Sequence, residues 1–303
     1  MNIVFFGGGK FAAPSLAALA KNFKIALVVT NPEKPTGRRQ IPEPSAVEIE
    51  AKKLELSVIV TEKFNDGLAN TIKAANPSFF IVVDYGKIIP REILGIPPLG
   101  AINVHPSALP KYRGASPLQT AISNGETKTA ISIMLMDDQV DHGPILAQKK
   151  EKILPNDTYG SLYGRLSEEY PYFLVETLKK YLSGEIKPIP QKNSEATFTK
   201  LLSREDGRID WSKSAEEIER MVRAYDPWPG TFTEWRGKRI KILKAGVVPR
   251  PVPTNTRPGD FFETPDKQLA VSCGGSGLIL NRIQPEGKKP ISGEEFARGY
   301  LKA

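Results

Sequence analysis

Two side chains able to handle a carbonyl oxygen and a proton lie two positions apart, Asn103 and His105. They close a short apolar run that is typical of a strand, and alternation along a strand places both side chains on one face. An amide can donate a hydrogen bond to a carbonyl oxygen, and an imidazole can accept and release a proton. The pair is a candidate for chemistry at a carbonyl group, and a hydrogen-bonded core histidine is the alternative interpretation of His105.

Such an imidazole needs a carboxylate to orient it or to move protons, and candidates follow in residues 136–143. This acidic turn contains Asp137, Asp138 and Asp141, and spacing alone does not choose among them. His142 lies in the same turn, and we interpret it as a turn residue rather than as a second base.

Few histidines and cysteines are available as zinc ligands or disulfide partners. The 303-residue chain has two histidines and one cysteine, Cys273. One cysteine cannot form an internal disulfide, and these residues cannot build a Cys/His zinc site of the usual four ligands. The N-terminus has no signal-like leader, and no run of about 18 apolar residues occurs. We therefore expect a cytoplasmic protein without a membrane partner.

The first half of the chain must position the candidate residues, and there short apolar runs alternate with amphipathic segments. We expect strands over 3–6, 25–29, 58–60, 79–83 and 101–104. We expect helices over 11–20, 46–54 and 68–75, and a loop over 31–45. This alternation predicts an α/β fold with a doubly wound, mostly parallel, Rossmann-like sheet. Strands over 130–136 and 145–149 and a helix over 158–182 follow.

The last third of the chain has a different pattern. A helix over 215–224 precedes short strands over 232–235, 238–245, 259–262, 269–272 and 278–283. Short strands at near-even spacing, separated by Gly/Pro turns, predict a small OB-like β-barrel. We therefore expect a catalytic domain over 1–188, a linker over 189–206 and a C-terminal β-barrel domain over 207–303.

A glycine-rich turn, Gly7-Gly8-Gly9, follows the first strand and is one element of a dinucleotide-binding motif. The motif also requires an acidic residue at the tip of the second strand, where this chain has Val29-Thr30-Asn31-Pro32. We therefore favour a tight strand-to-helix turn over a nicotinamide site.

Residues 103–114 begin with Asn-Val-His and continue with Ser107-Ala108-Leu109-Pro110 and Tyr112-Arg113-Gly114. This order resembles the pattern of the folate-dependent formyltransferases, in which an aspartate follows further along the chain. The resemblance selects Asp141 among the three aspartates, a choice that spacing does not make.

The similarity to this family extends over nearly the whole chain. Matching segments lie at 115–119, 124–127, 207–211, 227–230 and 292–300. Within the family, the chain most resembles the members that formylate methionyl initiator tRNA. The implied partners are that tRNA and the formyl donor 10-formyltetrahydrofolate, and the implied product is N-formylmethionyl-tRNA for translation initiation. We expect the protein to be a monomer.

The resemblance implies a role for each of three residues. His105 acts as general base or proton shuttle toward the methionyl α-amine. Asn103 hydrogen-bonds the formyl oxygen and the oxyanion that develops on it, and Asp141 holds His105 and assists proton transfer. Neither a covalent enzyme intermediate nor a metal is implied.

The resemblance also implies binding residues. The folate pocket would be lined by Ser107, Ala108, Leu109, Pro110, Tyr85, Gly86, Ile88 and Ile89. The loop 35–39 would contact the acceptor end of the tRNA through Arg38 and Arg39. From the residues alone, this loop is only a basic, exposed turn.

The C-terminal domain independently favours a nucleic-acid partner. Residues 236–258 contain seven basic residues and no acidic one, in a chain of net charge +8. Alternation puts Arg239 and Lys241 on one face of a strand and Ile240 and Ile242 on the other. A strand with one buried and one basic face fits contacts to backbone phosphates, and a solvated strand face is the alternative.

Several positions depart from the family pattern. They are Gly8-Gly9-Lys10 in the first turn, Gln40 and Ile41 in the entry loop, Pro106 and Ala108 beside His105, and His142-Gly143-Pro144 in the acidic turn. None is one of the three implied catalytic residues, so they bear on substrate preference more than on reaction type.

Three competing functions remain. A sugar-amine formyltransferase and a formyltetrahydrofolate hydrolase use the same scaffold, and the basic strand favours a tRNA substrate over both. A third alternative is an RNA-binding protein with a degenerate catalytic sheet. It does not explain why Asn103, His105 and Asp141 are all present.

Overall fold

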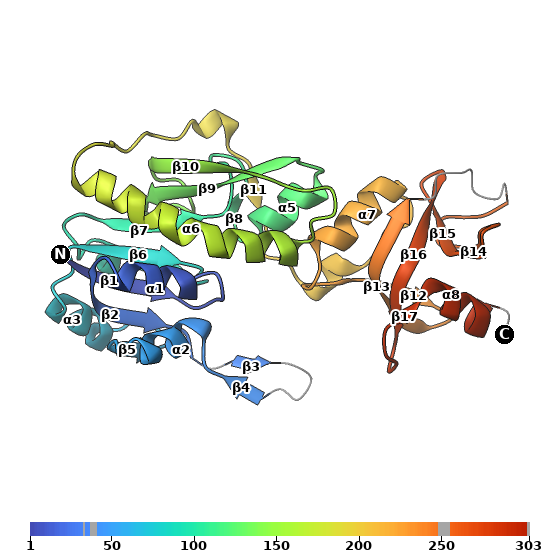
Figure 1. The fold of residues 1–303 in the computed structure, drawn as a ribbon, viewed down its shortest axis with the longest axis horizontal. Coiled ribbons are helices and arrows are strands. Elements are labelled where there is room, and N and C mark those ends of the chain that lie inside the picture. Colours follow the sequence, from blue (N-terminus) through green and yellow to red (C-terminus); the bar gives the residue numbers. More distant parts are fainter. Residues whose placement is uncertain (33, 37–40, 248–254, 302–303) are drawn as a thin grey trace. The chain divides into compact units, whose positions relative to one another are not determined.

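A computed structural model describes residues 1–32, 34–36, 41–247 and 255–301 of the protein (Figure 1). The chain divides into two compact units, and neither is a single run of sequence. The first unit comprises Met1–Pro117, Thr129–Glu151 and Tyr163–Thr199, and the second comprises Leu118–Lys128, Lys152–Leu162 and Lys200–Ala303. The second unit therefore combines the C-terminal third with two segments from earlier in the chain.

The first unit is built on a seven-stranded sheet. Its strands are β1 (Asn2–Gly7), β2 (Lys24–Thr30), β5 (Val58–Val60), β6 (Phe79–Val83), β7 (Ala101–His105), β9 (Lys128–Leu135) and β10 (Ile145–Lys152). Their order is β10-β9-β7-β6-β1-β2-β5. The pairs among β5, β2, β1, β6 and β7 are parallel, whereas β9 runs antiparallel to β7. The predicted mostly parallel sheet is confirmed.

Helices cover this sheet because the strands are apolar on both faces. They are α1 (Ala13–Ala20), α2 (Ala46–Lys53), α3 (Asp66–Ala74), α4 (Arg91–Leu94) and α6 (Tyr159–Leu182). On one face, Leu68 and Ile72 of α3 and Ile93 of α4 pack with Phe6 and Phe80 in one core cluster. This cluster is called the α3 core below, and it covers the sheet face that also carries the candidate site.

The long helix α6 is tied to the entry of α1 and to strand β10. The Tyr170 ring stacks on Phe11 with centroids 4.2 Å apart, and the main-chain N–H of Phe11 donates to the Tyr163 hydroxyl at 2.8 Å. Glu169 accepts from Lys149 of β10 at 3.3 Å. These contacts hold the helix expected over 158–182 against the sheet (Figure 1).

Two short strand pairs fall where a loop or no element was expected. Strands β3 (Lys34–Thr36) and β4 (Ile41–Glu43) form a hairpin within the predicted loop 31–45, and β8 (Arg113–Gly114) pairs with β11 (Phe198–Thr199). The hairpin was missed because each of its strands contains a proline, Pro35 and Pro42, and a proline normally argues against a strand. The second pair brings residue 198 beside residue 113, which no local pattern reveals.

The second unit contains a six-stranded antiparallel sheet in the part of the chain where we expected a small OB-like β-barrel. Its strands are β12 (Thr231–Trp235), β13 (Lys238–Val247), β14 (Phe261–Glu263), β15 (Leu269–Cys273), β16 (Ser276–Pro285) and β17 (Ile291–Ser292). The hydrogen-bonded path runs β12-β13-β16-β15-β14, and β17 pairs with β16. Helices α7 (Ala215–Ala224) and α8 (Gly293–Phe296) pack on it through a core that includes Ile218, Val222 and Phe296.

Candidate active site

Strand β7 carries Asn103 and His105 on the sheet face that holds the α3 core. Ala101 pairs with Phe80 and Asn103 with Val82, and residues in register across a sheet share a face. Ala101, Phe80 and Val82 all belong to the α3 core. Asn103 and His105 therefore lie where the apolar face of β7 ends, and His105 is only 4% exposed there.

The carboxylate of Asp141 meets both members of this pair. Its Oδ1 accepts a hydrogen bond from Asn103 Nδ2 at 3.2 Å, and its Oδ2 lies 3.4 Å from His105 Nδ1. Oδ2 also accepts the main-chain N–H of Gly114 at 2.8 Å. Three groups from two segments thus fix the orientation of one carboxylate.

His105 faces an acceptor on each side of its ring. Nε2 lies 2.9 Å from the carbonyl oxygen of Tyr112, which can only accept, so Nε2 carries a hydrogen. On the other side, Nδ1 faces Asp141 Oδ2 at 3.4 Å, longer than an ordinary N–H···O bond. A proton taken up at Nδ1 would meet this carboxylate, so the ring is suited to proton uptake on its Asp141 side.

Asn103 retains hydrogen-bonding capacity beyond its bond to Asp141. One amide hydrogen goes to the carboxylate, and within the described part of the chain no protein group takes the second. The side chain is half-buried. A donor held in place by a carboxylate is preorganised for a carbonyl oxygen that gains negative charge during a reaction.

Strands β9 and β10 fasten the loop that follows β7. Ser132 Oγ of β9 donates to the Ser107 carbonyl oxygen at 2.6 Å, and Gln148 Nε2 of β10 donates to the Leu109 carbonyl oxygen at 2.8 Å. Within the loop, Ser107 Oγ donates to the Lys111 carbonyl oxygen at 2.7 Å. The two neighbouring strands thereby hold the loop that supplies the acceptor for the imidazole.

The turn after β9 holds Asp141 in a left-handed backbone conformation. Its φ is 48°, which costs a non-glycine residue about 1 kcal/mol. A Cβ at Gly143 would lie 1.9 Å from the Leu135 carbonyl oxygen, so that position requires glycine. The turn is therefore folded tightly back onto β9.

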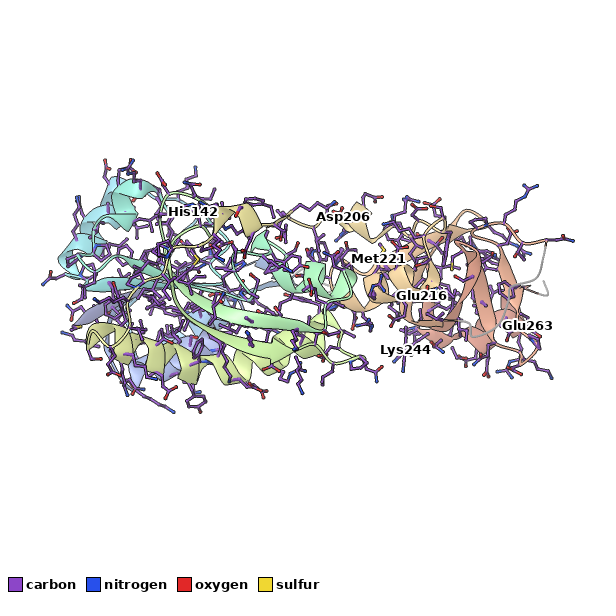
Figure 2. The ribbon with its side chains drawn as sticks, turned by 90° about the horizontal axis from the view of Figure 1, so that it is seen from above. His142, Asp206, Glu216, Met221, Lys244 and Glu263 are labelled. Carbon is purple, nitrogen blue, oxygen red and sulfur yellow. The ribbon has the colours of Figure 1, made fainter. Side chains whose placement is uncertain are left out.

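The other polar residues of this turn interact with one another. Asp137 Oδ2 lies 2.6 Å from His142 Nδ1, and Asp137 Oδ1 accepts the main-chain N–H of Gln139. Asp138 is exposed, and His142 is partly exposed and labelled in Figure 2. The structure thus places Asp141, rather than Asp137 or Asp138, against Asn103 and His105.

The glycine-rich turn packs against protein groups. The main-chain N–H groups of Gly8 and Gly9 donate to the Asp84 carbonyl oxygen at 3.2 and 3.3 Å. A Cβ at Gly9 would lie 1.7 Å from Asp84 Oδ2, and one at Gly8 would lie 2.7 Å from Asn31 Nδ2. A carboxylate against this turn disfavours a pyrophosphate there, which supports the interpretation as a tight structural turn.

Two family models match this chain. Formyl transferase matches residues 1–178, and formyl transferase, C-terminal domain, matches residues 201–301. The chain belongs to the formyl transferase family. It is 43% identical to the methionyl-tRNA formyltransferase of Roseiflexus castenholzii over 302 residues, which cover 99% of this chain and 96% of that one. It is 37% identical to the protein of that name from Myxococcus xanthus over 299 residues, 98% of this chain and 95% of that one.

Solved structures of low sequence identity share the fold of this formyltransferase. The N-formyltransferase from Helicobacter canadensis, determined with folinic acid and dTDP-3-aminofucose, has a TM-score of 0.70 and 21% identity, covering 93% of this chain and 98% of that one. The methionyl-tRNA formyltransferase from Clostridium thermocellum has a TM-score of 0.58 and 20% identity, covering 81% of this chain and 93% of that one. These likenesses establish the fold.

The residues expected to line a folate pocket fall into two groups in this formyltransferase. Four are buried, each at most 4% exposed: Ser107, Leu109, Tyr85 and Ile89. Gly86 is exposed, Ile88 is 86% exposed, and Ala108 and Pro110 are half-buried. The four buried side chains are closed to solvent, and the other four residues are exposed or partly exposed.

The residues expected to contact tRNA are described in part. Arg38 and Arg39 lie outside the described residues. On β13, Ile240 and Ile242 are buried and Lys241 is exposed, as alternation predicts. Arg239 is engaged by protein groups: its guanidinium lies 3.9 Å from the centroid of the Phe232 ring and 3.7 Å from a Glu205 carboxylate oxygen.

Sequence reasoning missed three groups that complete the site. They are the Tyr112 carbonyl, the Gly114 N–H and the side chain of Gln191, which donates to the main chain of the Asp141 turn. Main-chain groups leave no signal in residue type. Gln191 lies in the segment expected to be a linker, where a contact with a residue fifty positions away has no local pattern.

Within the described ranges, no three His, Cys, Asp or Glu side chains cluster as metal ligands would. The helices that the structure describes include none long and apolar enough to span a membrane.

Proposed function

We propose that this formyltransferase transfers the formyl group of 10-formyltetrahydrofolate to the α-amine of methionyl initiator tRNA. Relatives named methionyl-tRNA formyltransferase, 37–43% identical over nearly the full chain, support the substrate pair. The observation that supports the chemistry is the contact of one carboxylate, Asp141, with both Asn103 and His105.

The reaction forms one C–N bond and breaks another. The neutral α-amine attacks the formyl carbon, and the carbonyl π electrons move onto the oxygen to give a tetrahedral intermediate. The attacking nitrogen loses one proton, and the folate nitrogen gains one as its bond to the formyl carbon breaks. One proton carrier and one oxyanion donor therefore suffice.

The three residues divide this work. Asn103 donates its second amide hydrogen to the formyl oxygen as negative charge develops there. His105 takes the amine proton at Nδ1, where Asp141 Oδ2 lies 3.4 Å away to stabilise it, and delivers it to the folate nitrogen. Proton transfer by a positioned side chain contributes typically about 10²- to 10⁴-fold.

Two loops at neighbouring strands suit the folate donor. Strand β6 pairs with β7 in parallel, so the turn after β6 and the loop after β7 lie at the same edge of the sheet. Ile88 in the first is 86% exposed, and Ala108 in the second is half-buried. An exposed apolar side chain in a turn at the same sheet edge as the polar pair fits the flat ring system of a folate.

The basic face of β13 suits the tRNA. Lys241 and Lys244 are exposed, and Lys244 lies directly opposite Arg282 of β16. Within the described residues, no carboxylate pairs with any of these three cations. Like charges that face each other across two strands repel, and a polyanion relieves that repulsion. We also propose that the protein works as a cytoplasmic monomer without a membrane partner.

A formylation assay tests the proposal. Purified protein with 10-formyltetrahydrofolate is expected to formylate methionyl initiator tRNA, with matched methionyl elongator tRNA as the control. Transfer to a nucleotide-linked amino sugar without transfer to methionyl-tRNA would contradict the proposal. Release of formate without any acceptor would favour the hydrolase, and RNA binding without turnover would favour a non-catalytic protein.

A further inference from the structure

Gln191 joins two segments that the proposed mechanism requires. Its Oε1 accepts two hydrogen bonds from the Arg113 guanidinium, from Nε at 3.2 Å and from Nη2 at 2.8 Å. Its Nε2 donates to the carbonyl oxygens of Asp141 at 2.9 Å and Gly143 at 2.8 Å. Every hydrogen-bonding position of this amide is therefore used, half toward each segment.

Arg113 is a fixed point for this connection. The residue is 3% exposed, and within the described residues its guanidinium has neutral hydrogen-bond partners, Gln191 and Asn193, rather than an acid. The residues on either side of it in sequence contact His105 and Asp141. The Tyr112 carbonyl accepts a hydrogen bond from His105, and the Gly114 N–H donates one to Asp141. Holding Arg113 thus holds the loop that faces both groups.

The backbone of the Asp141 turn requires such a restraint. The left-handed φ of 48° at Asp141 persists only where surrounding contacts over-determine it. Asn103 and Gly114 restrain the carboxylate, whereas Gln191 restrains the main chain on both sides of His142. Without Gln191, only the contacts of its carboxylate would oppose relaxation of the Asp141 backbone, and that relaxation would move the carboxylate relative to His105 and Asn103.

We propose that Gln191 is a positioning residue for formyl transfer, an inference that rests on the proposed function. It couples the buried Arg113 to the main chain of the Asp141 turn. This coupling keeps Asp141 at the distance from His105 and Asn103 that proton transfer and oxyanion binding require. Gln191 acts through Asp141 rather than on the substrate.

A second connection runs along the same segment. Asn193 Oδ1 accepts from Arg113 Nη2 at 2.8 Å, and Asn193 Nδ2 lies 3.0 Å from His142 Nε2. His142 Nδ1 in turn lies 2.6 Å from Asp137 Oδ2, so in the neutral ring Nδ1 donates and Nε2 accepts. His142 departs from the family pattern, and this outer connection gives it a use in the present chain.

Two substitutions at one position separate positioning from structural support. Gln191→Ala removes all four hydrogen bonds. Gln191→Glu keeps an acceptor for Arg113 but cannot donate to the two carbonyl oxygens of the turn. Ser194→Ala is the matched control, because Ser194 is exposed on the same segment and has no hydrogen bond within the described residues. Measurements are kcat, KM for each substrate, thermal unfolding, and amide hydrogen exchange over residues 137–143.

The inference predicts that both Gln191 variants lose between about 10- and 100-fold in kcat, with KM for each substrate within about twofold of the parent protein. Gln191→Glu should keep the parental Tm, and both variants should exchange faster in the turn. Full activity in Gln191→Glu would overturn the inference, since Gln191 would then serve only Arg113. Unchanged exchange in the turn would overturn it as well. A parent protein that formylates no methionyl-tRNA would contradict the proposed function instead, and hydrogen exchange would still test the coupling.

Discussion

The Asp141 site of the first unit and the basic face of β13 in the second unit hold their charges in opposite ways. At the site, one carboxylate accepts hydrogen bonds from Asn103 and Gly114 and faces the imidazole of His105, which is almost fully buried. On β13, Lys241 and Lys244 are exposed and carry no ion pair within the described residues. Fixed groups suit a reaction whose geometry matters to a fraction of an ångström, and free cations suit a flexible polyanion.

Substitutions at the Asp141 site should have the largest effect, and they should lower kcat. His105→Ala removes the only imidazole at the site and should lower kcat for formyl transfer by about 10³-fold, with Tm changed by a few degrees. Asp141→Ala should have a similar effect on kcat. Steady-state kinetics with saturating tRNA measure both. If His105→Ala kept more than about a tenth of the parental kcat, another group would have to carry the proton.

Substitution on β13 should affect binding and leave chemistry intact. Lys241→Ala combined with Lys244→Ala (Lys244 is labelled in Figure 2) should raise KM for methionyl-tRNA about 10-fold at low salt. The kcat and the KM for folate should be unchanged, and the dependence of tRNA affinity on salt should become shallower. Surface substitution of a matched lysine, Lys53→Ala on α2, is the control. An unaltered salt dependence in the double variant would show that β13 does not contact the phosphates.

The smallest effect is expected at the exposed folate-facing position. Ile88→Ala removes a side chain that is 86% exposed, so stability should change by less than about 0.5 kcal/mol. KM for 10-formyltetrahydrofolate should rise about three- to tenfold, because apolar area against the ring system is lost. Initial rates over a range of 10-formyltetrahydrofolate concentrations measure this KM. A KM equal to that of the parent would place the folate elsewhere.

The sequence predicted the parts of this fold that depend on local pattern. Alternation of apolar runs and helices gave the mostly parallel sheet, and the helix expected over 215–224 matches α7 (Ala215–Ala224). Alternation also predicted correctly that Ile240 and Ile242 of β13 are buried and that Lys241 is exposed. These features depend on the periodicity of apolar residues, which can be recognised from residues that are close together in sequence.

Contacts between distant segments could not be predicted in this way. The hydrogen bonds of Gln191 connect residues about fifty and eighty positions apart, and the β8–β11 pair has two residues on each strand. Asp141 was selected by family resemblance, because three aspartates in one turn look equivalent in spacing. In the structure, Asp141 is distinguished by its contacts with Asn103, His105 and Gly114.

The second unit is assembled from three separate segments of the chain, so a single cut cannot isolate it. The C-terminal family match begins at residue 201, yet Arg220 of α7 donates to the Ser123 carbonyl oxygen and Arg223 donates to that of Asp157. A fragment that begins at 201 would lack both acceptors, which belong to its own unit. The boundary of the family match therefore differs from the boundary of the compact unit. Exchanging this unit between relatives would require transferring all three of its chain segments together.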